Sequence, residues 1–344
     1  MRLALLVPGP FDAVSGGYAY DRRMVAGLRA AGHEVRVIEL AGRHPLADDM
    51  ARQSAAMAWE ELAADETPII DGLGLPAFGA LSDAMSARPV VGLIHHPTAL
   101  ETGFSEDQRA LLSAAERRLM PLLSKVIVTS DPTAERLAAD FGVRHERIVV
   151  VVPGTEDAPR RAATAELPCH VLSIGTLVPR KGHDPLIRAV ARLTDLDWPL
   201  TIAGAPDRDA VHAHGLRALA EELAVARRVT FAGEVVDGAL EALWQQADIF
   251  ALATRWEGYG MAIAEALKRG LPVAITAGGA AGALVPPEAG AVCPVDDLDQ
   301  LSKALRRMIF DTDLRRYLAE HAWQAGQALP GWNAQAGKFA AALV

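Results

Sequence analysis

Short, continuous runs of apolar residues recur along the whole chain, and segments with the residue pattern of helices separate them. A strand that is covered by helices on both faces needs apolar side chains at every position, so its residues form a continuous apolar run. Strands that alternate with helices usually build a parallel, doubly wound sheet. The chain is therefore predicted to have an α/β fold. We expect strands at residues 3–7, 35–40, 68–71, 90–94, 126–129, 148–152, 171–174, 200–203, 229–232, 249–253, 273–275 and 291–293.

The length of the chain predicts two domains. It has 344 residues, more than one ordinary hydrophobic core supports. The segment 153–168 is polar, contains Ala and Pro, and lacks periodicity, so it is the expected linker. We therefore expect one Rossmann-like domain at residues 1–160 and another at 161–330. In such folds the ligand binds at the carboxyl ends of the strands, so we expect it in the cleft between the two domains.

Charge and composition exclude several classes of function. The formal net charge is −9, which argues against nucleic acid as a partner because phosphate binding needs a basic surface. The two cysteines, Cys169 and Cys293, lie far apart and in no metal-binding spacing, as in a reduced cytoplasmic protein. Residues 8–10 interrupt the first apolar run, which favours a strand over a signal peptide. Every apolar run is shorter than the about 20 residues of a spanning helix, so any membrane contact is expected to be peripheral.

Residues 254–267 combine a strand end, a glycine-rich loop and the start of a helix. Gly258 and Gly260 expose the backbone where the helix begins, and the N–H groups and positive dipole there suit an anionic or hydroxyl-rich ligand. Glu257 lies in the loop and Glu265 lies inside the helix, both among apolar or aromatic neighbours. A buried acid needs partners, and sugar hydroxyls would serve. Taken singly, the two acids are more typical of a loop acid near a helix dipole and of a solvated helix face than of a ligand site.

This stretch also carries a family resemblance. Residues 257–265 resemble the E-G-[FY]-G-x-x-x-x-E element of the GT-B glycosyltransferases, family 4, and the resemblance covers nearly the whole chain in the same order. It implies the GT-B fold, with an acceptor-binding first domain, a second domain that binds a nucleotide sugar, and a C-terminal helix at about 331–344 that packs back on the first. The implied activity is retaining transfer of a sugar from a UDP- or GDP-sugar donor to an acceptor hydroxyl. By resemblance, Glu257 contacts the donor sugar and Glu265 the ribose. The remaining donor-binding residues of this element are Gly258, Tyr259, Gly260 and Met261.

A pair of cations, Arg180 and Lys181, follows the predicted strand at 171–174. Two cations at a strand end form an anion site, and they would stabilise the charge that develops on a diphosphate leaving group. An isolated Arg-Lys pair is also typical of a solvated surface. The segment resembles the G-R-L-x-x-x-K-G element of family 4, but Thr176 stands where arginine is usual. The resemblance therefore assigns a catalytic and donor-binding role to Lys181, and Arg180 is expected to supply the missing charge.

Three further segments complete the expected site. Gly16 and Gly17 follow the first strand, where glycines let a backbone approach a phosphate, although a Gly-Gly loop is often only a turn. Imidazoles at residues 95 and 96 end the strand at 90–94, and each could instead be a hydrogen-bonded loop residue. By resemblance, the glycines face the donor phosphate and the acceptor, His95 lies near the reacting centre and His96 contacts the acceptor. Residues 231–235 resemble the base-binding segment, which assigns donor contacts to Glu234 and Val235.

The sequence lacks the motifs of several other enzyme classes. It contains no P-loop, zinc spacing, Gly-x-Ser-x-Gly elbow or dinucleotide-binding fingerprint, and its Asp-x-Asp at 311–313 lies away from the strand ends. We therefore expect neither a permanently bound cofactor nor a metal. Two other functions stay open: a sugar-nucleotide epimerase or hydrolase on the same fold, and a non-catalytic nucleotide-sugar-binding protein. The acceptor, whether small molecule, glycan or lipid, and the oligomeric state are not readable from the sequence.

Overall fold

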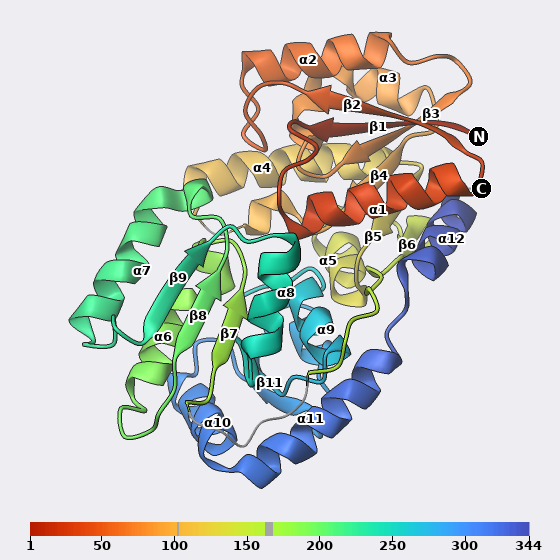
Figure 1. The fold of residues 1–344 in the computed structure, drawn as a ribbon. Coiled ribbons are helices and arrows are strands. Elements are labelled where there is room, and N and C mark those ends of the chain that lie inside the picture. Colours follow the sequence, from red (N-terminus) through yellow and green to blue (C-terminus); the bar gives the residue numbers. More distant parts are fainter. Residues whose placement is uncertain (102, 162–167, 344) are drawn as a thin grey trace. The chain divides into compact units, whose positions relative to one another are not determined.

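A computed structural model describes residues 1–101, 103–161 and 168–343 (Figure 1). The chain folds into two compact units. Unit 1 comprises Met1–Gly154 and Gly331–Val344, and unit 2 comprises Thr155–Pro330. The division at Gly154 comes a few residues before the expected position at 160. Within the expected linker, residues 162–167 lie outside the described part of the chain.

Unit 1 contains a six-stranded parallel sheet with the strand order β2-β1-β3-β4-β5-β6. The strands are β1 (Arg2–Pro8), β2 (Glu34–Leu40), β3 (Glu66–Asp71), β4 (Val91–Ile94), β5 (Lys125–Val128) and β6 (Ile148–Val150). The longer helices of this unit are α1 (Gly16–Ala30), α2 (Asp49–Glu60), α4 (Glu106–Leu119), α5 (Asp131–Phe141) and α12 (Trp332–Leu343), and α3 (Ser82–Ser86) is short.

Helices cover both faces of this sheet, which explains why its strands are apolar at consecutive positions. Leu5 of β1 packs into a core formed with α1 and α12, whereas the next residue, Leu6, packs into a core with α2 and α4 on the other face. Phe339 of α12 is fully buried in the first of these cores. The last helix of the chain therefore belongs to unit 1, beside α1 (Figure 1).

Unit 2 contains a second six-stranded parallel sheet, with the order β12-β11-β10-β7-β8-β9. Its strands are β7 (Val171–Ile174), β8 (Leu200–Ala203), β9 (Val229–Gly233), β10 (Ile249–Leu252), β11 (Val273–Thr276) and β12 (Gly290–Cys293). Its helices include α6 (His183–Ala191), α7 (Ala210–Glu222), α8 (Asp237–Gln246), α9 (Met261–Lys268), α10 (Leu298–Phe310) and α11 (Thr312–Gln327). Ile249 and Phe250 of β10 again point into cores on opposite faces. The predicted α/β class is confirmed in both units.

The strand order determines where each unit can bind a ligand. In unit 2 the chain runs from β7 to β8 and β9 on one side, and β10, β11 and β12 lie on the other side. The chain therefore continues from β7 and from β10 toward opposite edges of the sheet, and such a switch point is where open α/β sheets bind ligands. In unit 1 the corresponding switch lies between β1 and β3.

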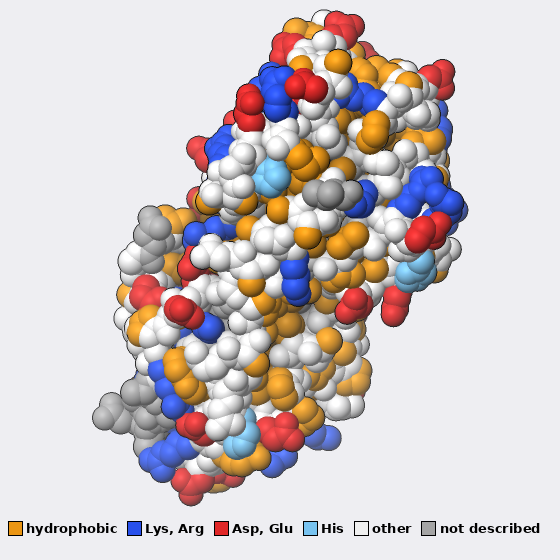
Figure 2. All heavy atoms as spheres, turned by 90° about the vertical axis from the view of Figure 1, so that its right-hand side faces the viewer, with side chains coloured by type: hydrophobic (Ala, Val, Ile, Leu, Met, Phe, Trp, Pro, Cys, Tyr) orange, Lys and Arg blue, Asp and Glu red, His pale blue; other side chains and the backbone are white. Residues whose placement is uncertain are grey.

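The surface carries both signs of charge. Figure 2 shows acidic and basic side chains interspersed on the face it draws, in keeping with the modest negative net charge of −9. Among the described helices, none has both the length and the apolar character needed to cross a membrane.

Candidate functional site

The loops after β7 and β10 are joined to each other at the switch point of unit 2. The loop after β7 ends in the 3-10 turn Pro179–Lys181, and the loop after β10 leads into α9. The Arg255 N–H donates to the Arg180 carbonyl at 2.8 Å. At Gly182 a Cβ atom would lie 1.8 Å from the Ala253 carbonyl oxygen, so only glycine permits this close approach of the two loops. The contact between the two loops thus places Arg180 and Lys181 beside Glu257.

Lys181 and Arg180 converge on the carboxylate of Glu257. The Lys181 Nζ donates to Glu257 Oε1 at 2.7 Å, and the Arg180 Nη1 lies 3.7 Å from the same oxygen. The Arg180 Nη1 also donates to the Trp256 carbonyl at 2.7 Å, and the Thr254 hydroxyl donates to Glu257 Oε1 at 3.1 Å. The Glu257 N–H donates to the carbonyl of Gly278, which fixes the backbone of the acid against the loop after β11.

The electrostatics of this cluster keep Glu257 ionised although only 6% of it is exposed. Burial by itself would raise the pKa of this carboxyl group. The charges of Lys181 and Arg180, together with hydrogen bonds from Lys181 and Thr254, outweigh burial, and the pKa is lowered. The result is a buried acid with two cations at the carboxyl ends of adjacent strands, able to bind an anion through the cations and hydroxyl groups through the carboxylate.

Helix α9 begins directly after the loop that carries Glu257. Gly260 has a φ of 107°, a conformation that favours glycine, and α9 begins at the next residue, Met261. Gly258 and Met261 are half-buried, whereas Tyr259 is buried and burial raises its pKa to about 12. The Tyr259 side chain is therefore part of the core, and only the backbone of this residue is left for the expected contact with a ligand, which stays a prediction.

Glu265 lies one turn into α9 and is half-buried. Its pKa is raised to about 7: loss of hydration is the main cause, the charge of Arg269 opposes it, and the acids Glu156 and Glu241 add to it. The Arg269 guanidinium donates to Glu241 at 2.6 Å and to the main-chain carbonyl of Glu265. Within residues 1–101, 103–161 and 168–343, no hydrogen bond to the Glu265 carboxylate is seen. Its oxygens are therefore open to a hydroxyl-bearing ligand.

Arg255 supports the loops of this candidate site, a contact that the sequence did not reveal. Its guanidinium forms a two-point pair with Asp184 of α6, at 3.0 and 2.9 Å, and its Nε donates to Asp296 at 3.1 Å. It also donates to the Pro179 carbonyl, so it clamps the loop that carries Arg180 and Lys181. A single arginine next to Trp256 matches no motif, and only the tertiary contacts show its role.

Glu234 and Val235 follow β9, at the edge of the sheet. Glu234 is exposed and Val235 is half-exposed. In the described part of unit 2, neither side chain contributes to the Arg180–Lys181–Glu257 cluster. Their expected contact with a nucleotide base stays a prediction.

In unit 1, the glycine loop and His95 meet. Gly16 and Gly17 are the first residues of α1, and the Ser15 hydroxyl caps the helix by accepting from the Tyr18 N–H. A Cβ atom at Gly17 would lie 3.4 Å from His95 Cδ2, so this residue packs against the imidazole edge. Two segments that are far apart in sequence thus form one surface at the carboxyl end of the first sheet.

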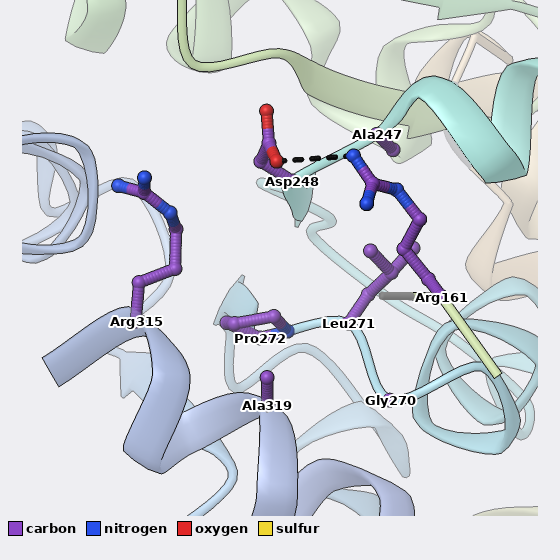
Figure 3. Close-up of a pocket in the computed structure, with 8 residues that line it drawn as sticks. All are labelled: Arg161, Ala247, Asp248, Gly270, Leu271, Pro272, Arg315 and Ala319. Atoms are coloured by element: carbon purple, nitrogen blue, oxygen red, sulfur yellow. Dashed lines mark hydrogen bonds and ion pairs between the residues drawn. The ribbon is translucent and has the colours of Figure 1, made fainter. Parts of the chain in front are cut away.

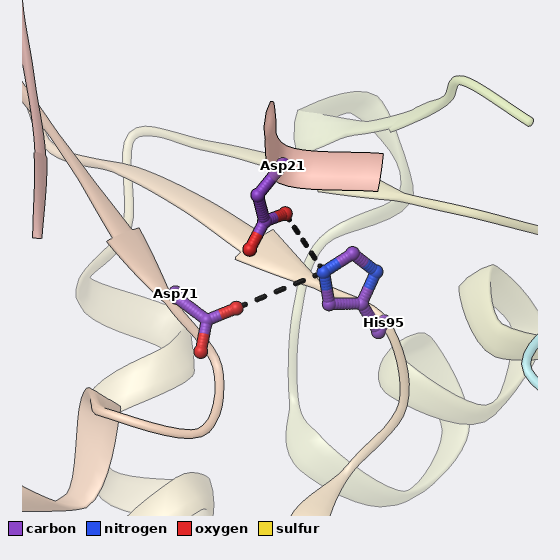
Figure 4. Close-up of side chains that lie close together, drawn as sticks. All are labelled: Asp21, Asp71 and His95. Atoms are coloured by element: carbon purple, nitrogen blue, oxygen red, sulfur yellow. Dashed lines mark hydrogen bonds and ion pairs between the residues drawn. The ribbon is translucent and has the colours of Figure 1, made fainter. Parts of the chain in front are cut away.

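His95 is part of a buried cluster with two acids that the sequence analysis did not single out (Figure 4). Its Nε2 lies 3.0 Å from Asp21 Oδ1 of α1 and 3.7 Å from Asp71 Oδ2, at the end of β3. The three side chains each bring one polar atom within 4.8 Å of the others. Nε2 lies at hydrogen-bond distance from Asp21, and Asp71 places a second carboxylate beside the same nitrogen. Asp71 is an acid at the last position of an apolar strand, and this pattern could have indicated it as a candidate site residue.

The same cluster shifts the pKa values of its members. Burial lowers the pKa of His95, but the charge and hydrogen bond of Asp21 and the charge of Asp71 outweigh it, and the pKa is raised. Burial and the neighbouring Asp21 raise the pKa of Asp71 to about 7, against the opposing charge of His95. The cluster therefore retains protons near neutral pH.

His96 turns away from this cluster and pairs with Glu101, its Nε2 lying 2.7 Å from the carboxylate. The loop that follows it is held by the fully buried Glu116 of α4. One oxygen of Glu116 accepts from the Thr98 N–H at 2.6 Å, and the other accepts from the Ala99 N–H at 3.1 Å. Glu116 thus anchors the loop that carries both histidines.

A separate cavity in unit 2 is structural. It has a volume of about 10 Å³, room for about one water molecule, and Figure 3 shows the residues that line it. Several of them directly precede β10 and β11, so the cavity lies at the opposite end of these strands from the acids and cations described above. Arg161 and Asp248 form an ion pair at its rim, at 3.3 Å. Its lining consists of Arg161, Ala247, Asp248, Gly270, Leu271, Pro272, Arg315 and Ala319. It is too small for a sugar.

Models of known protein families match residues in both units of the chain. Residues 15–158 match the model of Glycosyltransferase Family 4, and residues 155–324 match the model of Glycosyl transferases group 1. The chain belongs to the family 4 glycosyltransferases. The family that the loop at 257–265 indicated is thereby confirmed.

Relatives of this family 4 member agree in sequence and in fold. The D-inositol 3-phosphate glycosyltransferase of Mycobacterium tuberculosis is 29% identical over 208 residues, which are 56% of this chain. The match spans 43% of that protein, less than half its length. Sucrose-phosphate synthase from Thermosynechococcus elongatus has a TM-score of 0.82 at 21% identity, with 99% of this chain and 98% of that chain covered. Anabaena HepE in complex with UDP-glucose has a TM-score of 0.80 at 18% identity, covering 100% and 99%. These structures establish the GT-B fold.

Proposed function

We propose that this chain transfers a sugar from a nucleotide sugar to an acceptor hydroxyl, with retention of configuration at the sugar carbon. The observation that carries the proposal is the meeting of Arg180, Lys181 and Glu257 at the switch point of unit 2. Cations suit the diphosphate of a donor, and the acid beside them suits the hydroxyls of its sugar. The complex of Anabaena HepE with UDP-glucose supports a UDP-sugar as the donor, with a GDP-sugar as the second choice.

The two cations would act on the leaving group. As the bond between sugar and phosphate breaks, negative charge develops on the diphosphate, and fixed positive charges that face it lower the barrier. Lys181 and Arg180 are already held in place by Glu257 and by the Trp256 carbonyl, so little reorganisation is needed when the donor binds. Arg180 would thereby supply the charge that Thr176 does not.

Glu265 would bind the ribose. Its carboxylate is half-buried, and within the described residues no hydrogen bond to it is seen. Two ribose hydroxyls could each donate to one of its oxygens, which requires the ionised acid. Because its pKa is raised to about 7, nucleotide affinity should increase as the pH rises through neutrality.

Unit 1 would bind the acceptor. Gly16, Gly17 and His95 form one surface there, and His96 lies next to it in the chain. Retention on one face of the sugar needs no protein nucleophile if an oxygen of the departing phosphate accepts the proton of the acceptor hydroxyl. The proposal therefore assigns no covalent role to any side chain. A cleft in which the two ligands meet stays a prediction.

The test is a thermal-shift screen against UDP-, GDP- and ADP-sugars, followed by mass spectrometry of products with candidate acceptors. A ligand at 100 times its Kd stabilises the folded state by about 2.7 kcal/mol, which is measurable as a rise in melting temperature. Lys181→Ala and Glu265→Ala should each weaken nucleotide binding, whereas Lys303→Ala, at an exposed position of α10, should not. Unchanged nucleotide affinity in both site variants would argue strongly against these roles.

Two other outcomes would replace the proposal. Fast breakdown or epimerisation of the donor without any acceptor would indicate a hydrolase or an epimerase. Nucleotide binding without turnover on any acceptor would indicate a binding protein, which is the function that the threonine at position 176 favours.

A further inference from the structure

Two buried acids share one edge of the His95 imidazole. Asp21, from α1, and Asp71, from the end of β3, both approach Nε2, at 3.0 and 3.7 Å. Their side chains are only 1% and 5% exposed, so neither is placed to bind a ligand, whereas 21% of the His95 side chain is exposed. The acids therefore act on the histidine and not on a substrate.

The other ring nitrogen points away from both acids. Figure 4 shows Nδ1 on the opposite side of the imidazole from the two dashed contacts. In the part of the chain that the structure describes, no hydrogen bond to His95 Nδ1 is seen. The ring itself is held by its neighbours, with Tyr20 edge-on at 5.3 Å between centroids and Gly17 against the Cδ2 edge. The imidazole is thus fixed with one nitrogen anchored and one presented outward.

We propose that Asp21 and Asp71 are positioning residues that hold His95 as an imidazolium, with Nε2–H directed at the carboxylates and Nδ1–H presented as a hydrogen-bond donor. The recipient of this hydrogen bond is an oxygen of the sugar donor or acceptor, a step that rests on the proposed function. In this state His95 has no lone pair with which to accept a proton. The structure thus assigns His95 the role of a positively charged hydrogen-bond donor and excludes the role of a general base.

The charges around the ring support this assignment. Helix α1 contributes Asp21 and the phenol of Tyr20, β3 contributes Asp71, and the segment after β5 contributes the uncharged Thr129 hydroxyl, which donates to the His95 carbonyl. The tyrosine is buried and stays neutral, and the adjacent His96 is paired with its own acid. Two carboxylates thus face one histidine, an arrangement that stabilises the charged ring.

The deciding experiment is NMR titration of the full-length protein labelled at histidine, with His95→Gln to assign the resonance of residue 95. In the wild type, the nitrogen shifts should show both ring nitrogens protonated at pH 7. In Asp71→Asn and in Asp21→Asn, the midpoint of the His95 titration should move to lower pH. The matched control is Glu101→Gln, which should move the titration of His96 and leave that of His95 unchanged, because Glu101 pairs only with the second histidine of the two.

An unchanged His95 midpoint in both asparagine variants, or an unprotonated Nδ1 in the wild type at pH 7, would overturn the proposal. This titration reads the ring directly and needs no turnover, so it can fail or succeed independently of glycosyl transfer. Once a donor is known, kcat should decrease as the pH rises through the His95 midpoint. Asp71→Asn should move this decrease to lower pH without changing the KM for the donor, whereas an increase of kcat through the midpoint would identify a base and refute the assignment.

Discussion

Replacing Lys181 tests the central electrostatic argument without any knowledge of the substrate. In Lys181→Ala, Glu257 stays buried and loses the ammonium that donates to it at 2.7 Å. The side chains of the acid and of the lysine are only 7% and 16% exposed, so water can replace little of this interaction. We therefore expect the variant to be less stable than the wild type at pH 7.

The structure sets the size of the effect. Removing one partner of a buried ion pair usually costs about 3–5 kcal/mol, because an unpaired buried charge remains. Glu257 keeps the Arg180 guanidinium at 3.7 Å and the Thr254 hydroxyl at 3.1 Å. We therefore expect a loss of about 2–3 kcal/mol, at or just below the lower limit of that range. Glu257→Gln removes the charge itself, so the double variant should be more stable than the sum of the two single losses implies.

The assay is urea unfolding of the wild type, the two single variants and the double variant, with Lys303→Ala as a lysine control at an exposed position. The pKa of Glu257 is lowered in the folded state, so its contribution is present above the unfolded pKa and is lost as the pH falls through the folded pKa. The difference between Lys181→Ala and the wild type should therefore shrink in acid. A coupling energy below about 0.5 kcal/mol at pH 7 would refute the reasoning, since that is the scatter of independent sites.

Three further variants follow from the same structure. Glu265→Gln should weaken nucleotide binding most above pH 7 in calorimetry, while raising the melting temperature of the free protein there, because a carboxyl group with a pKa raised to about 7 destabilises the fold once ionised. Glu116→Ala should cost at least about 2 kcal/mol in urea unfolding, because it leaves two buried N–H groups at residues 98 and 99 without acceptors. Phe339→Ala should lower the free energy of unfolding by about 3–5 kcal/mol in the same measurement, because it leaves a cavity where α12 packs into the core with β1 and α1. The control Lys338→Ala, at the exposed neighbouring position, should change the free energy of unfolding little.

The strands were predictable because their signal is local. Each central strand is covered on both faces, so a few consecutive residues such as Leu5 and Leu6 must all be apolar, and a short window of sequence shows this. The Arg-Lys pair and the glycine-rich loop with Glu257 were visible for a related reason, because each lies within a few residues of a strand end. Strand identity, chain order and the family resemblance therefore came from sequence alone.

Which side chains meet depended on the order of strands in each sheet, and no window of sequence contains that order. His95, Asp21 and Asp71 come together only because β1, β3 and β4 are neighbours whose carboxyl ends lie at one edge. Arg255 reaches Asp184 for the corresponding reason, because β10 lies beside β7. The α/β class, the family and the main charged motifs of this protein can be read from the amino-acid sequence. The partners and protonation of those charges become visible only in the folded chain, because pairing and burial are properties of side chains brought together from distant parts of the sequence.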